Sequence, residues 1–293
     1  MNSLKFIKPA VCIPIHTSNL NKYELISIKS HIFKLQAHDV FLLLPNSKVS
    51  SIISVLERNN IPKNLYRIHQ VKDYCLKNSD NYQLLMLTIN FYQFYQSYSH
   101  ILIAQIDSYT FSDELIKWCR KDLDYIGAPC FKFKKYWTSE LYFCGVGGFS
   151  LRNIKKTLEL LEEDPIIFTF SDLREFSKPF NFKGKFILFL KFILTKLLRK
   201  DRLKRDIKFH SFTSKFKNFF IFINEDVCYA YYLPKYKKSF KVGNLKNSIS
   251  FCIDWNVQKQ LNNILPAYPF GAHAWFSYPE NLNEWEKHIE EIK

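Results

Sequence analysis

Four short segments carry the residue types that could do chemistry. They are Gln105-Ile106-Asp107, Gly145–Arg152, Asn224–Val227 and Pro269–Trp275. Carboxylate oxygens and imidazole nitrogens bind Mg²⁺ or Mn²⁺, and a carboxylate within reach of a hydroxyl group can remove its proton. The second segment holds three of the seven glycines, and glycine is needed where a Cβ would collide with a ligand. These residue types together point to a ligand site with a divalent ion, a general base, or both.

Asp107 is the most informative of these residues because of what precedes it. The run Ile101–Ile106 opens with Ile-Leu-Ile-Ala and predicts a strand buried on both faces, as in a parallel α/β sheet. An acid just beyond such a strand lies where these sheets bind ligands. The alternative is that Asp107 only caps a following helix.

The elements that must position these segments alternate between strand and helix in the first half of the chain, 1–130. Apolar runs predict strands at 10–15, 40–44, 65–71 and 101–106, and helical spacing predicts helices at 22–37, 49–58 and 81–98. This order predicts a mostly parallel central sheet with helices on both faces. The second half is less regular, with strands expected at 124–129, 143–151 and 219–223 and helices at 153–163 and 281–292.

Composition narrows the class of protein. The 293 residues are 47% hydrophobic and 24% charged, which is typical of a globular protein. The seven cysteines form no C-x-x-C pair, which argues against a disulfide scaffold or a zinc cluster. Without a secretory h-region or a run of about 20 apolar residues, we expect a cytoplasmic protein.

The motifs occur in a fixed order that resembles a known family. They are Asn81-Tyr82, Phe91-Tyr92, Gln105–Phe111, Trp118-Cys119, Asp124–Pro129, Gly147–Arg152, Asn224–Val227 and Pro269-Phe270-Gly271-x-His273-x-Trp275. Over roughly residues 8–275 the chain resembles a bacterial family catalogued as a domain of unknown function, regarded as GT-A-like glycosyltransferases and found around surface-polysaccharide genes. The last three motifs are also similar to the β-1,4-galactosyltransferase pattern.

The resemblance implies a single GT-A-like domain over 1–293, with a nucleotide-sugar-binding half at 1–130 and an acceptor half at 131–293. It implies transfer of a sugar to a hydroxyl of a surface glycan, such as lipopolysaccharide, lipooligosaccharide or capsule. Mn²⁺ or Mg²⁺ would be held by Asp107 and His273, and Asp226 would be the base beside Glu225, which orients hydroxyls. The residues expected to bind the donor are His16, Gln105, Asp107, Gly147, Gly148, Ser150 and Arg152. The galactosyltransferase pattern favours inversion at the anomeric carbon, with retention as the alternative.

Two positions depart from the family pattern. Val146 stands where the family commonly has Asn, and Gln105 replaces the first acid of an Asp-x-Asp motif. Metal binding that is weak without nucleotide, or dispensable, is therefore an open alternative.

Each site residue also has a plain structural interpretation. Glu225 and Asp226 would then be acids in a first helical turn capped by Asn224, and His273 a core histidine. Gly147-Gly148 would be a β-bulge, and Arg152 and His16 would be surface residues.

A basic segment interrupts the second half. Residues 174–217 hold 14 Lys and Arg against three acids, so +11 of the net charge of +15 lies there. Within it, residues 185–200 predict an amphipathic helix whose apolar arc runs through Phe186, Ile187, Leu190, Ile193, Leu194, Leu197 and Leu198. Such a helix is typical of a protein attached to the inner face of an anionic membrane. The alternative is a helix packed on the domain, with a solvated basic face.

Two other classes of function remain open. The positive charge and the aromatic content of 17% would suit nucleic-acid binding, but no RNP, KH, zinc-finger or helix-turn-helix pattern is present. A GT-A scaffold that binds without catalysing is the third possibility.

Overall fold

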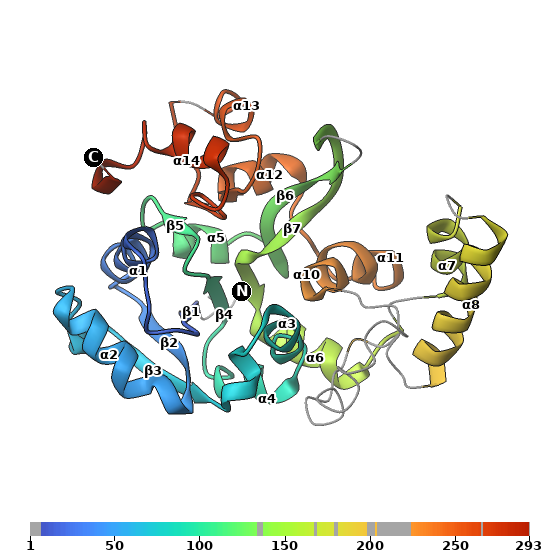
Figure 1. The fold of residues 1–293 in the computed structure, drawn as a ribbon, viewed down its shortest axis with the longest axis horizontal. Coiled ribbons are helices and arrows are strands. Elements are labelled where there is room, and N and C mark those ends of the chain that lie inside the picture. Colours follow the sequence, from blue (N-terminus) through green and yellow to red (C-terminus); the bar gives the residue numbers. More distant parts are fainter. Residues whose placement is uncertain are drawn as a thin grey trace, which may run out of the picture.

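A six-stranded mixed sheet forms the centre of the protein (Figure 1). The computed structural model describes residues 7–133, 137–166, 169–178, 181–197, 203, 224–264 and 266–292. The sheet order is β3-β2-β1-β4-β7-β6. Its strands are β1 Pro9–Pro14, β2 Asp39–Pro45, β3 Arg67–Val71, β4 His100–Ala104, β6 Tyr125–Phe133 and β7 Trp137–Asn153. Strands β3, β2, β1 and β4 are parallel, and β7 is antiparallel to both β4 and β6. The predicted mostly parallel α/β sheet is confirmed.

The helices cover both faces of the sheet because successive strand residues point to opposite sides. Ala10, Cys12, Ile101 and Ile103 face one core, which also contains residues of α3, α4 and α6. Val11, Ile13, Leu102 and Ala104 face the other, with residues of α1, α2 and α5. The bounds of these helices are α1 Lys22–Lys34, α2 Val49–Arg58, α3 Ser79–Leu85, α4 Ile89–Phe94, α5 Leu115–Cys119 and α6 Ile154–Glu163.

The prediction of one helix over 81–98 was wrong, because this segment forms two helices, α3 and α4. Thr88 has an extended backbone (φ −110°, ψ 141°) and separates α3 from α4. The hydroxyl groups of Tyr92 and Tyr229 donate to the carbonyl of Met86 at 3.0 and 3.3 Å. These buried tyrosines satisfy a backbone group that a continuous helix would have paired internally.

The C-terminal part adds a smaller layer. Strands β5 Tyr109–Thr110, β9 Gly271–Ala272 and β8 Cys252–Ile253 form a three-stranded sheet in that order. They share a third core with the helices of this region. The other α-helices among the described residues are α7 Phe170–Phe176, α8 Phe182–Leu197, α10 Glu225–Val227, α11 Leu233–Tyr236, α12 Leu245–Phe251, α13 Val257–Leu261 and α14 Pro279–Trp285, with a π-helical turn at Cys228–Tyr232.

Several elements predicted in the second half of the chain have different ends in the structure. β6 and β7 extend beyond the predicted 124–129 and 143–151 and form a long hairpin (Figure 1). The predicted C-terminal helix is α14 followed by a 3₁₀ turn at Glu290–Ile292. The strand predicted at 219–223, and residues 198–200 of the predicted basic helix, lie outside the described residues. Among the described helices, none is long and apolar enough to cross a membrane.

Candidate functional site

A cavity of about 450 Å³ opens at the carboxyl ends of β1 and β4. Helix α1, which follows β1, packs on one face of the sheet, and α3 and α4, which lead into β4, pack on the other. The two strands therefore flank the point where successive connections change face, which is where open α/β sheets bind ligands. His16, Gln105 and Asp107 all line this cavity, as do Lys77 and Tyr82.

The turn that carries Asp107 is held by His31, which no motif in the sequence had indicated. His31 of α1 is fully buried, with Nδ1 2.8 Å from Thr110 Oγ1 and Nε2 3.3 Å from the carbonyl oxygen of Gln105. Ser108 Oγ donates to the same carbonyl at 2.6 Å. Burial lowers the pKa of His31 to about 4, so the ring is neutral at pH 7. The neutral imidazole thus contacts the Gln105 carbonyl before Asp107 and the Thr110 hydroxyl after it.

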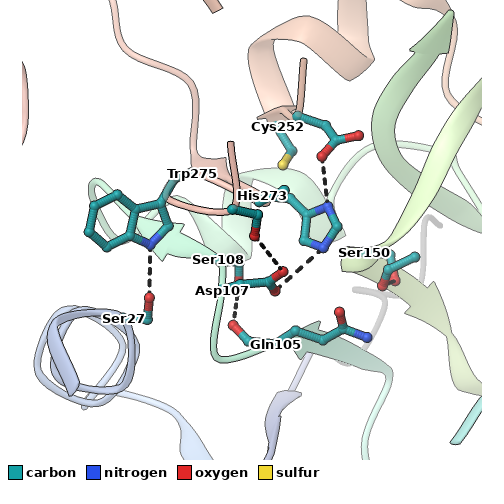
Figure 2. A network of polar contacts seen from close by, with 12 residues as sticks. Ser27, Gln105, Asp107, Ser108, Ser150, Cys252, His273 and Trp275 are labelled. Atoms are coloured by element: carbon teal, nitrogen blue, oxygen red, sulfur yellow. Dashed lines mark hydrogen bonds and ion pairs between the residues drawn. The ribbon is translucent and has the colours of Figure 1, made fainter. Parts of the chain in front are cut away.

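Asp107 faces His273, as Figure 2 shows. Asp107 Oδ1 lies 3.5 Å from His273 Nε2, and Asp254 Oδ1 lies 2.9 Å from Nδ1 on the other side of the ring. Burial disfavours the charged imidazole, but Asp107 and Asp254 outweigh this effect and raise the pKa of His273 to about 9. Asp107 and His273, which are far apart in the sequence, therefore form one cluster with Asp254.

Asp254 is the second residue that the sequence reasoning missed. It directly follows β8, and its carbonyl accepts a hydrogen bond of 2.8 Å from Asn281 Nδ2. A signal was present in the sequence, since Phe251-Cys252-Ile253-Asp254 is another short apolar run that ends in an acid. Because Asp254 accepts from Nδ1, it orients the ring so that Nε2 points toward Asp107.

The Asp107–His273 pair has the chemistry of a partial metal site. His273 Nε2 is buried and has no hydrogen-bond partner among the described residues. Two ligands of one ion, each about 2.1 Å from it, lie roughly 3.0–3.5 Å apart, and Nε2 and Oδ1 are 3.5 Å apart. In the part of the chain that the structure describes, no group of three or more His, Cys, Asp or Glu side chains could hold a metal ion. A bound diphosphate would supply oxygen ligands beside these two side chains.

Gly147 and Gly148 bring the other acids next to this cluster. A Cβ on Gly148 would lie 1.9 Å from His273 Nε2, and one on Gly147 would lie 2.3 Å from Glu225 Oε1. The pairing of β6 with β7 also jumps from Gly127–Ser150 to Ala128–Val146, so the two glycines lie in a bulge. The absence of a Cβ at these two positions makes room for the side chains of Glu225 and His273. The Gly-Gly motif in the sequence predicted room for a ligand instead.

Arg152 does not lie where a donor contact was expected. Its side chain is fully buried, and Nη2 donates to Glu225 Oε1 at 3.0 Å while Nη1 donates to Tyr92 Oη at 2.8 Å. Ser150 Oγ, also buried, accepts from Arg152 Nη2 at 3.1 Å and donates to the Gly147 carbonyl at 2.8 Å. Because its side chain is buried, Arg152 is not a surface residue either. Arg152 and Ser150 hold Glu225 and the glycine bulge in place.

Glu225 and Asp226 begin helix α10. Asn224 is its N-cap, as the structural interpretation expected, but its side chain makes no capping hydrogen bond. Burial raises the pKa of Glu225 to about 7, against the opposing effect of Arg152, and Oε2 has no hydrogen-bond partner among the described residues. Burial also raises the pKa of Asp226, and contacts with the backbone of Val227 and Gly147 oppose this effect. Asp226 is therefore a carboxylate of increased basicity within electrostatic range of His273.

Comparisons with solved structures find glycosyltransferases and a nucleotidyltransferase. The galactosyltransferase LgtC, in complex with donor and acceptor sugar analogues, is 10% identical over 90% of this chain and 86% of its own, with a TM-score of 0.49. An active-site mutant of LgtC is 12% identical over the same shares, also with a TM-score of 0.49. The 4-diphosphocytidyl-2C-methyl-D-erythritol synthase of Anaerococcus prevotii is 10% identical over 62% of this chain and 81% of its own, with a TM-score of 0.36.

Comparisons with sequences give a family but no curated relative. No curated protein matches the chain. Residues 65–273 match the family described as "Protein of unknown function (DUF5672)". This segment contains Asp107, the glycine bulge, Glu225, Asp226 and His273. The chain belongs to the DUF5672 family.

Proposed function

We propose that this protein is a glycosyltransferase that moves a sugar from a nucleotide-sugar donor to a hydroxyl group of a glycan. One observation carries the proposal: Asp107, which lines the cavity at the ends of β1 and β4, lies 3.5 Å from His273. A carboxylate and an imidazole suit a divalent ion that is shared with a diphosphate, and the ion would displace the proton that His273 Nε2 carries in its absence.

The donor would occupy this cavity with its diphosphate beside Asp107. His16 lies at the end of β1, where the nucleoside would be bound, and Gln105 offers an amide to the sugar or the phosphates. Asp107 and His273 Nε2 would hold Mn²⁺ or Mg²⁺, which stabilises the negative charge of a leaving diphosphate when it is bound.

Asp226 would act as the general base. The acceptor hydroxyl attacks the anomeric carbon, its proton passes to the Asp226 carboxylate, and the bond from that carbon to the diphosphate oxygen breaks. Burial supports this role, because it raises the pKa of Asp226 and so makes the carboxylate a stronger base. Direct displacement of this kind inverts the anomeric configuration, so a retained configuration in the product would exclude the step.

The acceptor we propose is a growing bacterial surface glycan, such as lipopolysaccharide, lipooligosaccharide or capsule, at the cytoplasmic face of the membrane. The order of motifs that resembles GT-A transferases of surface-polysaccharide clusters supports this choice. A screen of nucleotide sugars identifies the donor.

The test is a thermal-unfolding screen of nucleotide sugars with and without Mn²⁺. A ligand at 100 times its Kd adds about 2.7 kcal/mol to the free energy of unfolding, so a cognate donor should raise Tm by several degrees, and more with Mn²⁺. The matched control is Asp107→Asn, which should lose the Mn²⁺-dependent part of the increase. The proposal fails if none of the nucleotide sugars raises Tm of the unmodified chain.

A further inference from the structure

Helix α8 (Phe182–Leu197) presents an apolar face to solvent. Of the 17 large hydrophobic side chains that are exposed among the described residues, eight belong to this one helix. They are Phe182, Phe186, Ile187, Phe189, Leu190, Ile193, Leu194 and Leu197, with exposed fractions up to 87% for Phe182 and 72% for Leu197. A cluster of this kind marks an interaction surface more often than a chance exposure.

The opposite side of α8 is the one that packs on the protein. Phe192 and Thr195 are buried, at 8% and 0% exposed, and Leu188 packs against the same core. Phe170 of α7 contacts Phe192 edge-on, with ring centroids 6.1 Å apart. Leu188, Phe192 and Thr195 therefore anchor α8 on the protein, and none of the eight exposed side chains belongs to this packed side.

The charges on α8 are arranged around that face. At about 100° per residue, the eight exposed side chains cover an arc of roughly 160°. Lys191 borders one edge of the arc and Lys185 and Lys196 border the other, while Lys183 lies within it in the first turn. The helix contains no acidic residue. Lysines at the edges of an apolar face can extend their ammonium groups toward lipid phosphates while their stems lie along the acyl region.

Helix α7, which α8 packs against, contacts the helical segment that begins with α10. Asp172 of α7 lies 3.7 Å from Lys235 Nζ and accepts a hydrogen bond from Tyr236 Oη, and both partners belong to α11. Helix α11 continues from α10, where Glu225 and Asp226 lie, through the π-helical turn. Figure 1 shows α7 and α8 together at one end of the molecule, on the side of α10 and α11.

We infer that α8 docks the protein on the surface of an anionic lipid bilayer, with the apolar arc in the interface and Lys185, Lys191 and Lys196 at the level of the phosphates. Charge complementarity selects this occupant, because a purely apolar partner would not need lysines along both edges of the arc. The inference rests on α8 alone and stands whether or not the chain transfers sugars.

The test is flotation of the full chain with vesicles of phosphatidylcholine and phosphatidylglycerol in a two-to-one mixture, and with phosphatidylcholine alone, at physiological and at high NaCl concentration. Leu190→Asp/Leu194→Asp/Leu197→Asp should reduce binding to the anionic vesicles by roughly tenfold or more. The matched control, Phe33→Asp/Ile166→Asp/Leu245→Asp, makes the same charge change at three exposed apolar side chains elsewhere and should bind within twofold of the unmodified chain. Far-UV circular dichroism checks the fold of both variants.

A second measurement does not depend on the triple variant folding. Phe186→Trp places an indole on an exposed position of the arc, and brominated lipids in the anionic vesicles should quench the added emission. The inference is overturned if the unmodified chain stays unbound, if the control triple loses as much binding as the α8 triple, or if the emission of the introduced indole is not quenched. It is also overturned if sedimentation shows that the arc instead pairs two copies of the chain and that vesicles do not separate them.

Discussion

Two charged pairs near the ends of β4 and β7 differ in how they are built. Arg152 and Glu225 are both buried and are joined by a 3.0 Å hydrogen bond, with Tyr92 and Ser150 also bound to the guanidinium. Asp107 and His273 are partly open and lie 3.5 Å apart without a hydrogen bond between them, and Asp107 lines the cavity. In the first pair both charged groups are buried and joined directly, whereas in the second the two groups face each other without a hydrogen bond. On the function proposed above, the first pair would hold the site together and the second would bind the ligand.

The largest effect on activity is expected at Asp226, which lies near both the Arg152–Glu225 pair and His273. Asp226→Asn keeps the shape of the side chain but cannot accept the acceptor proton, so the transfer rate should fall about 10²–10⁴-fold. Donor binding should stay within a few-fold. Steady-state kinetics with the donor from the thermal screen measure both effects, and Asp122→Asn, at an exposed acid, is the control. Near-normal turnover of Asp226→Asn would remove Asp226 from the mechanism.

The next effect tests whether the buried pair is structural. Arg152→Met leaves the Glu225 carboxylate buried without its counter-ion, which should lower the free energy of unfolding by about 3–5 kcal/mol. Arg152→Met/Glu225→Leu should recover most of that loss, because neither charge remains. Urea denaturation at pH 7 measures both variants. If Arg152→Met loses less than about 1 kcal/mol, the pair is not what holds this region together.

A smaller effect is expected at the residue that orients His273. Asp254→Asn weakens the contact to Nδ1, and loss of such a partner typically lowers metal affinity or activity about 10–100-fold. Mn²⁺-dependent donor binding should therefore weaken by that factor, and by more in Asp107→Asn. Calorimetric titration of Mn²⁺ in the presence of donor gives the values. Equal effects of the two variants would mean that Asp254 does more than orient the ring.

The smallest effect concerns pH and the turn that carries Asp107. The pKa of His31 is lowered to about 4 by burial, so between pH 6.5 and 4 the unfolded chain binds more protons than the folded one. Stability from the neutral ring is thus present above pH 6.5 and is lost as the pH falls toward 4. In His31→Gln, the slope of unfolding free energy against pH in this window should be shallower by up to about 1.4 kcal/mol per pH unit.

His69→Gln is the matched control for the pH experiment. Burial lowers the pKa of His69 to about 4 as well, but this ring stacks on Phe94 and does not line the cavity. Both variants should therefore flatten the pH dependence, whereas only His31→Gln should weaken donor binding. Equal losses of binding would show that the His31 network is not specific to the Asp107 turn.

The sequence was sufficient to predict those strands and helices that depend on neighbouring residues in the chain. The apolar runs of β1, β2 and β4 predicted buried parallel strands, and the acid after β4 predicted the edge where the cavity lies. The break between α3 and α4 could not be predicted in this way. One of the two hydroxyl groups that stabilise it comes from Tyr229, which is distant from Met86 in the sequence.

The same limit applies to the site. Asp107 and His273 were predicted to meet because their motifs are distinctive, whereas the role of Arg152 depended on burial, which its motif does not encode. His31 looks like any helical histidine, because its partners Gln105, Ser108 and Thr110 belong to a distant segment of the sequence. Asp254 had a usable signal, the apolar run before it, but that run is shorter than the one before Asp107.

The central claim is that Asp107 and His273 together hold a divalent ion beside a donor diphosphate. The most direct measurement is pulsed electron paramagnetic resonance of Mn²⁺ added to the chain with its cognate nucleoside diphosphate. Bound Mn²⁺ should show coupling to an imidazole nitrogen that disappears in His273→Ala, and Mn²⁺ binding should be much weaker in Asp107→Asn. The same Mn²⁺ affinity and the same spectrum in all three proteins would contradict it.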